Sequence, residues 1–214
     1  MKSVIVLFGK PGAGKGTRLS QFLKGREDQF EYLGVSVLLK KEIASGTELG
    51  KKAKSYMDAG MLVPDELIIA MVLEKLSGIH KPVFLDGFPR TIPQATAMLE
   101  AGIIPVMVVE LSLDDKIILE RVRDRIVCKT CGESYTIGSY KHPKVEGVCD
   151  ICGGAVVKRN DDREDIVLNR FEVYNKETYP LLDVLAKANV PIFTIDNSNS
   201  KTAAAQFEAL MAPF

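Results

Sequence analysis

The chain has 214 residues, of which 46% are hydrophobic and 26% charged, and its 28 lysines and arginines equal its 28 aspartates and glutamates. These proportions are typical of a soluble globular protein, and a net charge of zero argues against a general binder of nucleic acids or membranes. Any phosphate site must therefore come from a local cluster of cations.

Nothing in the sequence resembles a targeting or membrane-spanning segment. The apolar run near the N-terminus is too short for a signal peptide, and no stretch approaches the ~20 apolar residues of a membrane span. We therefore expect a cytoplasmic protein without membrane or nucleic-acid partners. Four cysteines in a cytoplasmic chain indicate metal or redox chemistry rather than disulfides.

The predicted elements alternate between strands and helices. Apolar, β-branched runs predict buried strands, and helices are predicted where apolar residues keep helical spacing between start and stop signals. In chain order we expect a strand at 4–8, helices at 17–24, 37–45 and 48–59, a helix opening at Pro64, a strand at 83–86, a helix at 94–100, a strand at 104–111, helices at 113–123 and 162–187, the second kinked by Pro180, a strand at 191–195 and a helix at 202–211. This alternation predicts an α/β fold, a doubly wound parallel sheet with helices on both faces.

The segment 9–17, GKPGAGKGT, lies between the first strand and the first helix. Its glycines let backbone N–H groups surround phosphate oxygens, the helix N-terminus adds positive potential, and Lys15 can reach the β- and γ-phosphates. Because Gly16 follows Lys15, no hydroxyl is available at that position to bind magnesium directly. The segment predicts a phosphate loop that binds ATP through Gly12, Ala13, Gly14, Lys15, Gly16 and Thr17.

Two CxxC pairs, separated by 17 residues, predict a structural zinc site. Four protein thiolates leave no open position for a substrate, and the surrounding glycine-rich segment is too small to bury a core of its own. Iron in the same ligands stays an alternative. The predicted ligands are Cys128, Cys131, Cys149 and Cys152.

These motifs, in this order, resemble the adenylate kinases, a family of nucleoside monophosphate kinases. The resemblance rests on the phosphate loop, on DGFPR at 86–90, on Gln94, and on arginines that flank the cysteine insert. It covers nearly the whole chain. It implies a monomer that catalyses the reversible, Mg²⁺-dependent reaction ATP + AMP = 2 ADP. It also implies a phosphate-loop core (1–34, 63–125 and 160–214), an acceptor-binding helical insert (35–62) and a zinc-bound lid (126–159).

The resemblance also assigns roles to individual residues. Phosphoryl transfer needs positioned cations, and arginine binds phosphate with a bidentate fork. The implied catalytic residues are Lys15, Asp86, Arg90, Arg125, Arg159 and Arg170, with Asp86 holding magnesium through water. Further ATP contacts would come from Arg121, Arg125, Ser134, Tyr135 and Asn199. The AMP site would contain Val35, Lys40, Met61, Leu62, Val63, Gly87, Phe88, Pro89, Arg90, Gln94, Arg159 and Arg170.

The predicted acceptor site departs from the family pattern. Lys40 stands where the family has an arginine that grips the acceptor phosphate, Val35 replaces a threonine, and Val37 replaces an acid near the phosphates. The donor site is complete, and AMP is the expected acceptor. Two alternatives stay open: a kinase for another monophosphate, and a zinc-ribbon binding protein that uses ATP as a switch.

Overall fold

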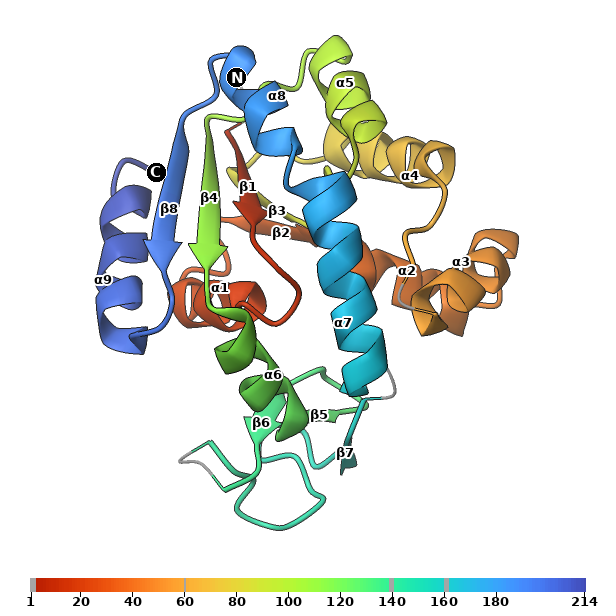
Figure 1. Cartoon of the computed structure of the whole chain (residues 1–214), viewed down its shortest axis with the longest axis vertical. Helices are drawn as coiled ribbons and strands as arrows, with labels where there is room; N and C mark the ends of the chain where they lie inside the picture. The colour runs from red at the N-terminus through yellow and green to blue at the C-terminus, as the bar shows by residue number, and fades with distance from the viewer. Residues whose placement is uncertain (1–2, 60, 139–140, 160–161) are drawn as a thin grey trace.

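A parallel sheet forms the centre of the molecule (Figure 1). The computed structural model describes residues 3–59, 61–138, 141–159 and 162–214. Within them the main sheet has five strands in the order β2-β3-β1-β4-β8, and each adjacent pair runs parallel. Because the strands point the same way, their carboxyl ends meet at one edge, where such sheets bind ligands. The strands are β1 (Val4–Phe8), β2 (Glu31–Gly34), β3 (Val83–Asp86), β4 (Met107–Ser112) and β8 (Ile192–Asp196).

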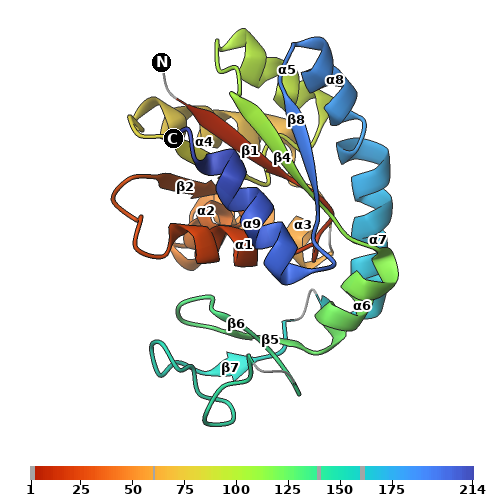
Figure 2. The same cartoon turned by 90° about the vertical axis from the view of Figure 1, so that its left-hand side faces the viewer.

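Helices cover both faces of this sheet, which confirms the predicted fold class. Figure 2 shows α1 and α9 on one side of the strands and α7 and α8 on the other. Among the described helices, none has both the length and the apolar character needed to cross a membrane. The helices are α1 (Lys15–Leu23), α2 (Val35–Ala44), α3 (Glu48–Asp58), α4 (Asp65–Ser77), α5 (Ile92–Glu100), α6 (Asp115–Arg123), α7 (Glu164–Val173), α8 (Leu181–Lys187) and α9 (Ser200–Met211).

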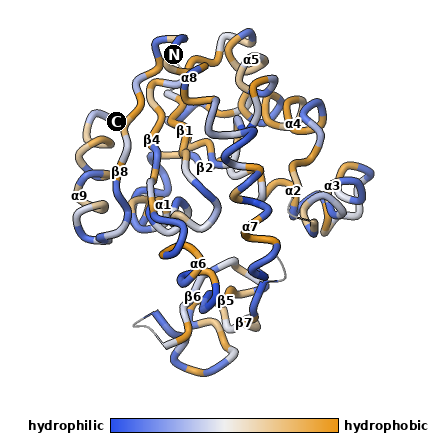
Figure 3. The backbone as a smooth tube through the Cα atoms, viewed as in Figure 1, coloured by the Kyte–Doolittle hydropathy of each residue, from blue (hydrophilic) through white to orange (hydrophobic). Residues whose placement is uncertain are grey.

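The core has two halves because successive side chains of a strand point to opposite faces. Val4, Val6 and Phe8 of β1 pack with apolar residues of α4, α5 and α8. Ile5 and Leu7 pack on the other face with α1, α6 and α9. Figure 3 shows the resulting concentration of hydrophobic residues along the central strands. Four phenylalanines with ring centroids 5.2–6.1 Å apart fill the second half: Phe22, Phe30, Phe84 and Phe207.

Two smaller units project from the body, one at its right-hand side and one below it (Figure 1). Helices α2 and α3 pack against each other beside α4. Below the body, a small antiparallel sheet in the order β6-β5-β7 lies between α6 and α7 in the chain. Its strands are β5 (Arg125–Cys128), β6 (Ser134–Thr136) and β7 (Val156–Val157).

The structure corrects the predicted elements in several places. Strand β2 and the strands of the small sheet were not predicted, and β4 begins at Met107 rather than at 104. The helix predicted at 162–187 with a kink at Pro180 is divided into segments: α7 is followed by a π-helical turn, Tyr174–Thr178, and then by α8. Pro180 explains the break, because it lacks an N–H group and clashes with the carbonyl four residues earlier. The N–H of Tyr179 accordingly bonds the carbonyl of Tyr174, five residues back, at 2.8 Å.

Candidate active site

The phosphate loop joins β1 to α1 at the carboxyl edge of the sheet. Gly14 has φ 95°, a left-handed conformation that other residues rarely adopt, and a Cβ there would lie 2.5 Å from Nδ2 of Asn197. Helix α1 begins directly afterwards at Lys15. The Lys15 ammonium donates hydrogen bonds to the carbonyls of Gly9 and Lys10, at 2.5 and 3.1 Å. The loop therefore places its lysine beside the positive end of a helix, as an anion site requires.

A single cavity of about 790 Å³ lies over this loop and reaches α2, the carboxyl end of β3, the small sheet and α7. It brings together most of the residues that the sequence singled out, although these lie up to 158 positions apart, from Gly12 to Arg170. The predicted site residues that line it are Gly12, Gly14, Lys15, Gly16, Thr17, Val35, Lys40, Met61, Leu62, Val63, Asp86, Gly87, Pro89, Arg90, Gln94, Arg121, Arg125, Ser134, Arg159 and Arg170.

Four predicted site residues do not line this cavity. Ala13 is fully buried, and its carbonyl accepts a hydrogen bond from Asn197 Nδ2 at 2.6 Å. Phe88 packs in the core, 1% exposed. Asn199 caps α9 by accepting hydrogen bonds from the first N–H groups of that helix. Tyr135 is buried beside the cysteines in the small sheet.

Half-buried cations dominate the electrostatics of the cavity. Burial lowers the pKa of Lys15 to about 8, Asp86 opposes that shift, and the charges of Arg90 and Arg170 add to it. Burial also lowers the pKa of Arg90, again against the influence of Asp86. A carboxylate favours the charged form of a nearby cation, whereas desolvation and like charges disfavour it. Asp86 therefore compensates only part of the desolvation cost of these cations. The negative charge of a ligand's phosphate groups would compensate the remainder.

The Gln94 side chain is fixed by hydrogen bonds inside the protein. Its Oε1 accepts from the backbone N–H of Arg90 at 2.8 Å, and its Nε2 donates to Asp65 Oδ1 at 2.7 Å. Asp65 also accepts from Thr91 Oγ1 at 2.8 Å. On the other side, Thr178 Oγ1 donates to the carbonyl of Arg90 at 2.9 Å. These contacts hold the backbone that carries the Arg90 guanidinium at the cavity wall.

Two arginines at or next to the small sheet, Arg125 and Arg121, are held by contacts with the body. Arg125 pairs with Asp162 through both Nε, at 2.8 Å, and Nη2, and the Asp162 side chain is only 4% exposed. The next residue, Arg163, occupies the N-cap position of α7. Arg121 on α6 reaches the carbonyl of Asn197 at 3.3 Å. The neighbouring residues 160 and 161 lie outside the described residues.

Sequence reasoning missed two supports of the phosphate loop. Asn197, at the end of β8, is 4% exposed and accepts a hydrogen bond from Arg18 Nη2 at 2.7 Å, besides donating to the loop carbonyl of Ala13. Lys10, within the loop, pairs with Asp115 on α6 at 2.6 Å, and its ammonium lies 5.3 Å from the ring centroid of Phe171. No local motif could have predicted that Asn197 and Lys10 support the loop, because the contacts Lys10–Asp115 and Asn197–Ala13 each span more than 100 residues of sequence.

The four predicted metal ligands converge in the small sheet. Their sulfur atoms all lie within 4.8 Å of one another, with Cys128 and Cys152 3.5 Å apart and Cys131 and Cys149 3.6 Å apart. A tetrahedral zinc ion with Zn–S bonds of ~2.3 Å places its sulfurs about 3.8 Å apart, so the cluster fits zinc.

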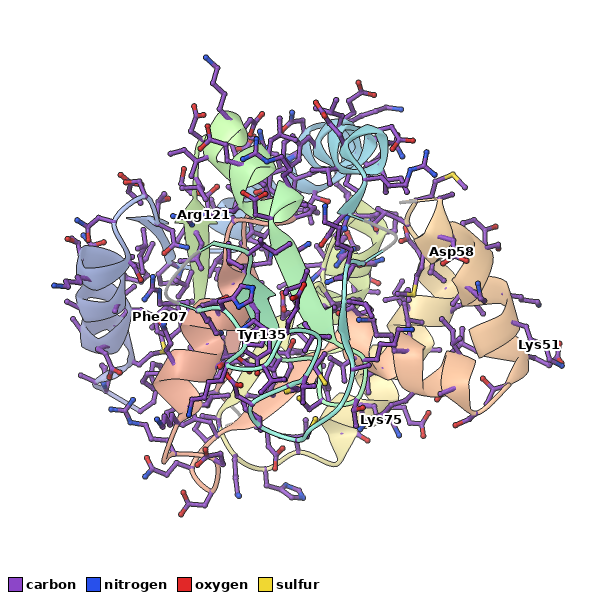
Figure 4. All side chains as sticks on the ribbon, turned by 90° about the horizontal axis from the view of Figure 1, so that it is seen from below. Lys51, Asp58, Lys75, Arg121, Tyr135 and Phe207 are labelled. Carbon is purple, nitrogen blue, oxygen red and sulfur yellow. The ribbon has the colours of Figure 1, made fainter. Side chains whose placement is uncertain are left out.

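Tyr135 supports this cluster from the inside. Figure 4, a view from below, shows Tyr135 under the loops of the small sheet with sulfur atoms drawn close to it. Its hydroxyl lies 3.3 Å from Cys149 Sγ and accepts a hydrogen bond from the Asp150 N–H at 2.8 Å. This hydroxyl lowers the pKa of Cys149 to about 6, which favours the thiolate that a metal requires. Tyr135 thus belongs to the cysteine cluster and not to the cavity wall.

Comparisons with known proteins agree with this geometry. The family model for adenylate kinase matches residues 7–190. The adenylate kinase of Caldicellulosiruptor bescii is 44% identical over 84% of this chain and 85% of its own length. The adenylate kinases of Carboxydothermus hydrogenoformans and Methanosarcina barkeri are each 42% identical, over 92% and 91% of both chains respectively. Matches of this length to adenylate kinases favour neither of the two alternatives, a kinase for another monophosphate or a binding protein that uses ATP as a switch. The chain therefore belongs to the adenylate kinase family and is a phosphotransferase.

Proposed function

We propose that this enzyme transfers the γ-phosphoryl group of ATP to AMP inside the cavity described above. The observation that supports this most strongly is that the phosphate loop, Lys40 on α2 and the arginines of α7 and the small sheet line one continuous cavity. In the proposed arrangement the triphosphate lies on the loop around Lys15 and under Arg121, Arg125 and Arg159. The acceptor phosphate lies between Arg90 and Arg170.

The proposed chemistry is positioning and charge stabilisation. The transition state of phosphoryl transfer spreads negative charge over the equatorial oxygens, and preorganised cations stabilise that charge without reorganising. Lys15 and Arg90 are already held at the cavity wall by hydrogen bonds to the loop and by the Gln94 network. Closure of the small sheet over the cavity would exclude water from the transfer.

The residues present fit the two metal ions that the family implies. Magnesium prefers oxygen ligands and keeps several waters while bridging phosphates, and Asp86 offers a carboxylate at the cavity wall beside Lys15. Magnesium bound there with ATP would neutralise phosphate charge. The four cysteines would hold one zinc ion, which would stabilise the small sheet.

The proposal extends to the organisation of the chain. We propose that residues 35–62 act as the acceptor-binding insert and residues 126–159 as a zinc-bound lid on a core of 1–34, 63–125 and 160–214. The cavity is lined from all three parts, which supports this division. We further propose a cytoplasmic monomer without nucleic-acid or membrane partners, in keeping with its balanced charge.

Lys40→Arg tests the acceptor assignment. Lys40 lines the cavity, and a bidentate guanidinium contact to phosphate is stronger than a single ammonium contact. We expect the acceptor KM for AMP at saturating ATP to fall by a few-fold, on the order of 1 kcal/mol, while the KM for ATP stays the same. Lys41→Arg, one position further along α2 and absent from the cavity wall, is the matched control.

An acceptor panel completes the test. A coupled assay for ADP formation with AMP, GMP, CMP and UMP should show the highest kcat/KM with AMP. A different preferred acceptor would overturn AMP as the substrate and leave the donor site intact. An unchanged or raised KM for AMP in Lys40→Arg would show that Lys40 does not grip the acceptor phosphate.

A further inference from the structure

The edge strand β2 carries a tyrosine that reaches into the active-site cavity. Tyr32 lines that cavity, and its hydroxyl donates a hydrogen bond to Asp86 Oδ2 at 3.1 Å. The register of β2 and β3 places Tyr32 beside Phe84 and Gly34 beside Asp86. The tyrosine side chain therefore runs along its own strand, over Gly34, to reach the carboxylate at the end of the neighbouring strand.

Gly34 provides the space for this path. Its backbone, with φ −98° and ψ 116°, is ordinary extended structure that any residue can adopt, so conformation does not require glycine here. A Cβ at this position would instead lie within 2.6 Å of Tyr32 Cζ and closer still to the hydroxyl oxygen. Side chains two residues apart share one face of a strand. The absence of a side chain at Gly34 thus leaves room for the Tyr32 ring, and in this position the Tyr32 hydroxyl can donate a hydrogen bond to Asp86.

Asp86 is one of two acidic residues among the described residues that line the cavity, and the other, Glu133, is paired with Lys141 at 2.7 Å. Oδ2 of Asp86 accepts the hydrogen bond from the Tyr32 hydroxyl, whereas Oδ1 accepts no hydrogen bond from the part of the chain that the structure describes. One oxygen of the carboxylate is therefore held while the other stays available to the cavity.

We propose that Tyr32 is a positioning residue that orients the Asp86 carboxylate toward magnesium bound with ATP. This inference rests on the proposed function of Asp86. The tyrosine acts as a neutral donor at all working pH values, because burial and the charge of Asp86 both raise the pKa of its hydroxyl. A neutral donor fixes the carboxylate without cancelling the negative charge that attracts the metal ion.

Covering an edge glycine with an aromatic ring can also stabilise a sheet without any role in the site. The two roles separate in Tyr32→Phe, which keeps the ring over Gly34 and removes only the hydroxyl. A role confined to the sheet predicts no change in magnesium response, whereas the positioning role predicts a specific change.

The experiment measures the affinity of the intact enzyme for β,γ-imido-ATP by calorimetry, in EDTA and in saturating MgCl₂. The magnesium response is the dissociation constant in EDTA divided by the dissociation constant in MgCl₂. In Tyr32→Phe we expect this ratio to be roughly fivefold smaller than in the wild type, which is about 1 kcal/mol, while the affinity in EDTA stays within about twofold. Gly34→Ala, which must displace the Tyr32 ring, should reduce the magnesium response by the same factor. The double variant Tyr32→Phe/Gly34→Ala should reduce it no further than either single variant.

Matched controls are Tyr179→Phe, on an exposed tyrosine outside this cavity, and Gly78→Ala, at a helix end whose Cβ meets no atom closer than 3.9 Å. Asp86→Asn is the reference variant. If Asp86→Asn loses the magnesium response and Tyr32→Phe keeps it, the role of Tyr32 is overturned and that of Asp86 stands. If Tyr32→Phe weakens binding equally with and without magnesium, the tyrosine supports only the fold. If Asp86→Asn keeps the full response, both the role of Asp86 and the inference on Tyr32 are overturned.

Discussion

Replacement of Lys15 by methionine should stabilise the nucleotide-free enzyme while it abolishes transfer. Methionine keeps most of the length of the side chain and removes its charge. Burial lowers the pKa of Lys15 from 10.5 to about 8. The folded state therefore holds this proton less tightly than the unfolded state, so the charged lysine lowers the free energy of unfolding.

The size of this effect follows from the two pKa values. At ~1.4 kcal/mol per factor of ten, the difference between 10.5 and about 8 corresponds to about 3 kcal/mol as an upper bound. Lys15 remains partly exposed, and the variant leaves the carbonyls of Gly9 and Lys10 without their ammonium donor. We therefore expect a net gain of roughly 1–2 kcal/mol at pH 7.

The sign of the pH dependence is fixed by the same values. The penalty is fully present below pH 8, declines as the folded lysine loses its proton, and is gone above about pH 10.5, where both states are neutral. Between pH 8 and 10 the wild type should therefore gain stability relative to Lys15→Met.

Urea unfolding of the nucleotide-free protein at pH 7, 8, 9 and 10 measures this difference, and a coupled ADP assay measures transfer. Turnover should fall by at least ~10²–10³, as for other losses of a preorganised charge contact. Lys24→Met, directly after α1 and outside the cavity, controls for the loss of one positive charge. Parallel pH dependences for wild type and Lys15→Met would refute the reasoning, since Lys15 would then be no harder to charge in the folded state.

Three further predictions follow from the supports of the site. Asp162→Asn should lower the free energy of unfolding in urea by roughly 1–3 kcal/mol, because it leaves Arg125 without the carboxylate that now pairs with it. Asn197→Ala should cost a similar amount and should also raise the KM for ATP, because it removes a hydrogen-bond partner from Arg18 and from the phosphate loop. Cys131→Ser should reduce zinc from about one ion per chain, as elemental analysis would show, and an unmodified chain without transition metal would contradict the zinc site.

The features that the sequence predicted well are those whose signal is local. The strand–loop–helix order around 9–17 is written in consecutive residues, because a phosphate loop needs glycines, a lysine and a helix start in one short segment. The spacing of the paired cysteines likewise predicts, by itself, that they bind one metal ion. Local patterns of this kind single out residues that the fold then places around one cavity.

Features defined by a distant partner could not be predicted in this way. Strand β2 is short and half exposed, and it is a strand because β3 pairs with it. Asp162 lies just before α7 in the sequence, yet its side chain pairs with Arg125, which lies 37 residues earlier. Tyr135 was assigned to ATP by resemblance, but its hydroxyl bonds within the cysteine cluster. In each case a long-range contact outweighs the local signal.

The positive charges of this enzyme are concentrated in the cavity, and this distribution affects both its stability and its binding of phosphate groups. The chain as a whole is neutral, with 28 basic and 28 acidic residues, yet the cavity gathers Lys15, Arg90 and further arginines around Asp86. Burial makes Lys15 and Arg90 harder to charge, so holding these cations in the cavity lowers the free energy of unfolding. Phosphate groups relieve that cost when they bind, because they stabilise the charged forms. Nucleotide binding should therefore stabilise the wild type more than Lys15→Met, because the same desolvation that makes these cations costly to hold also strengthens their attraction for bound phosphate groups.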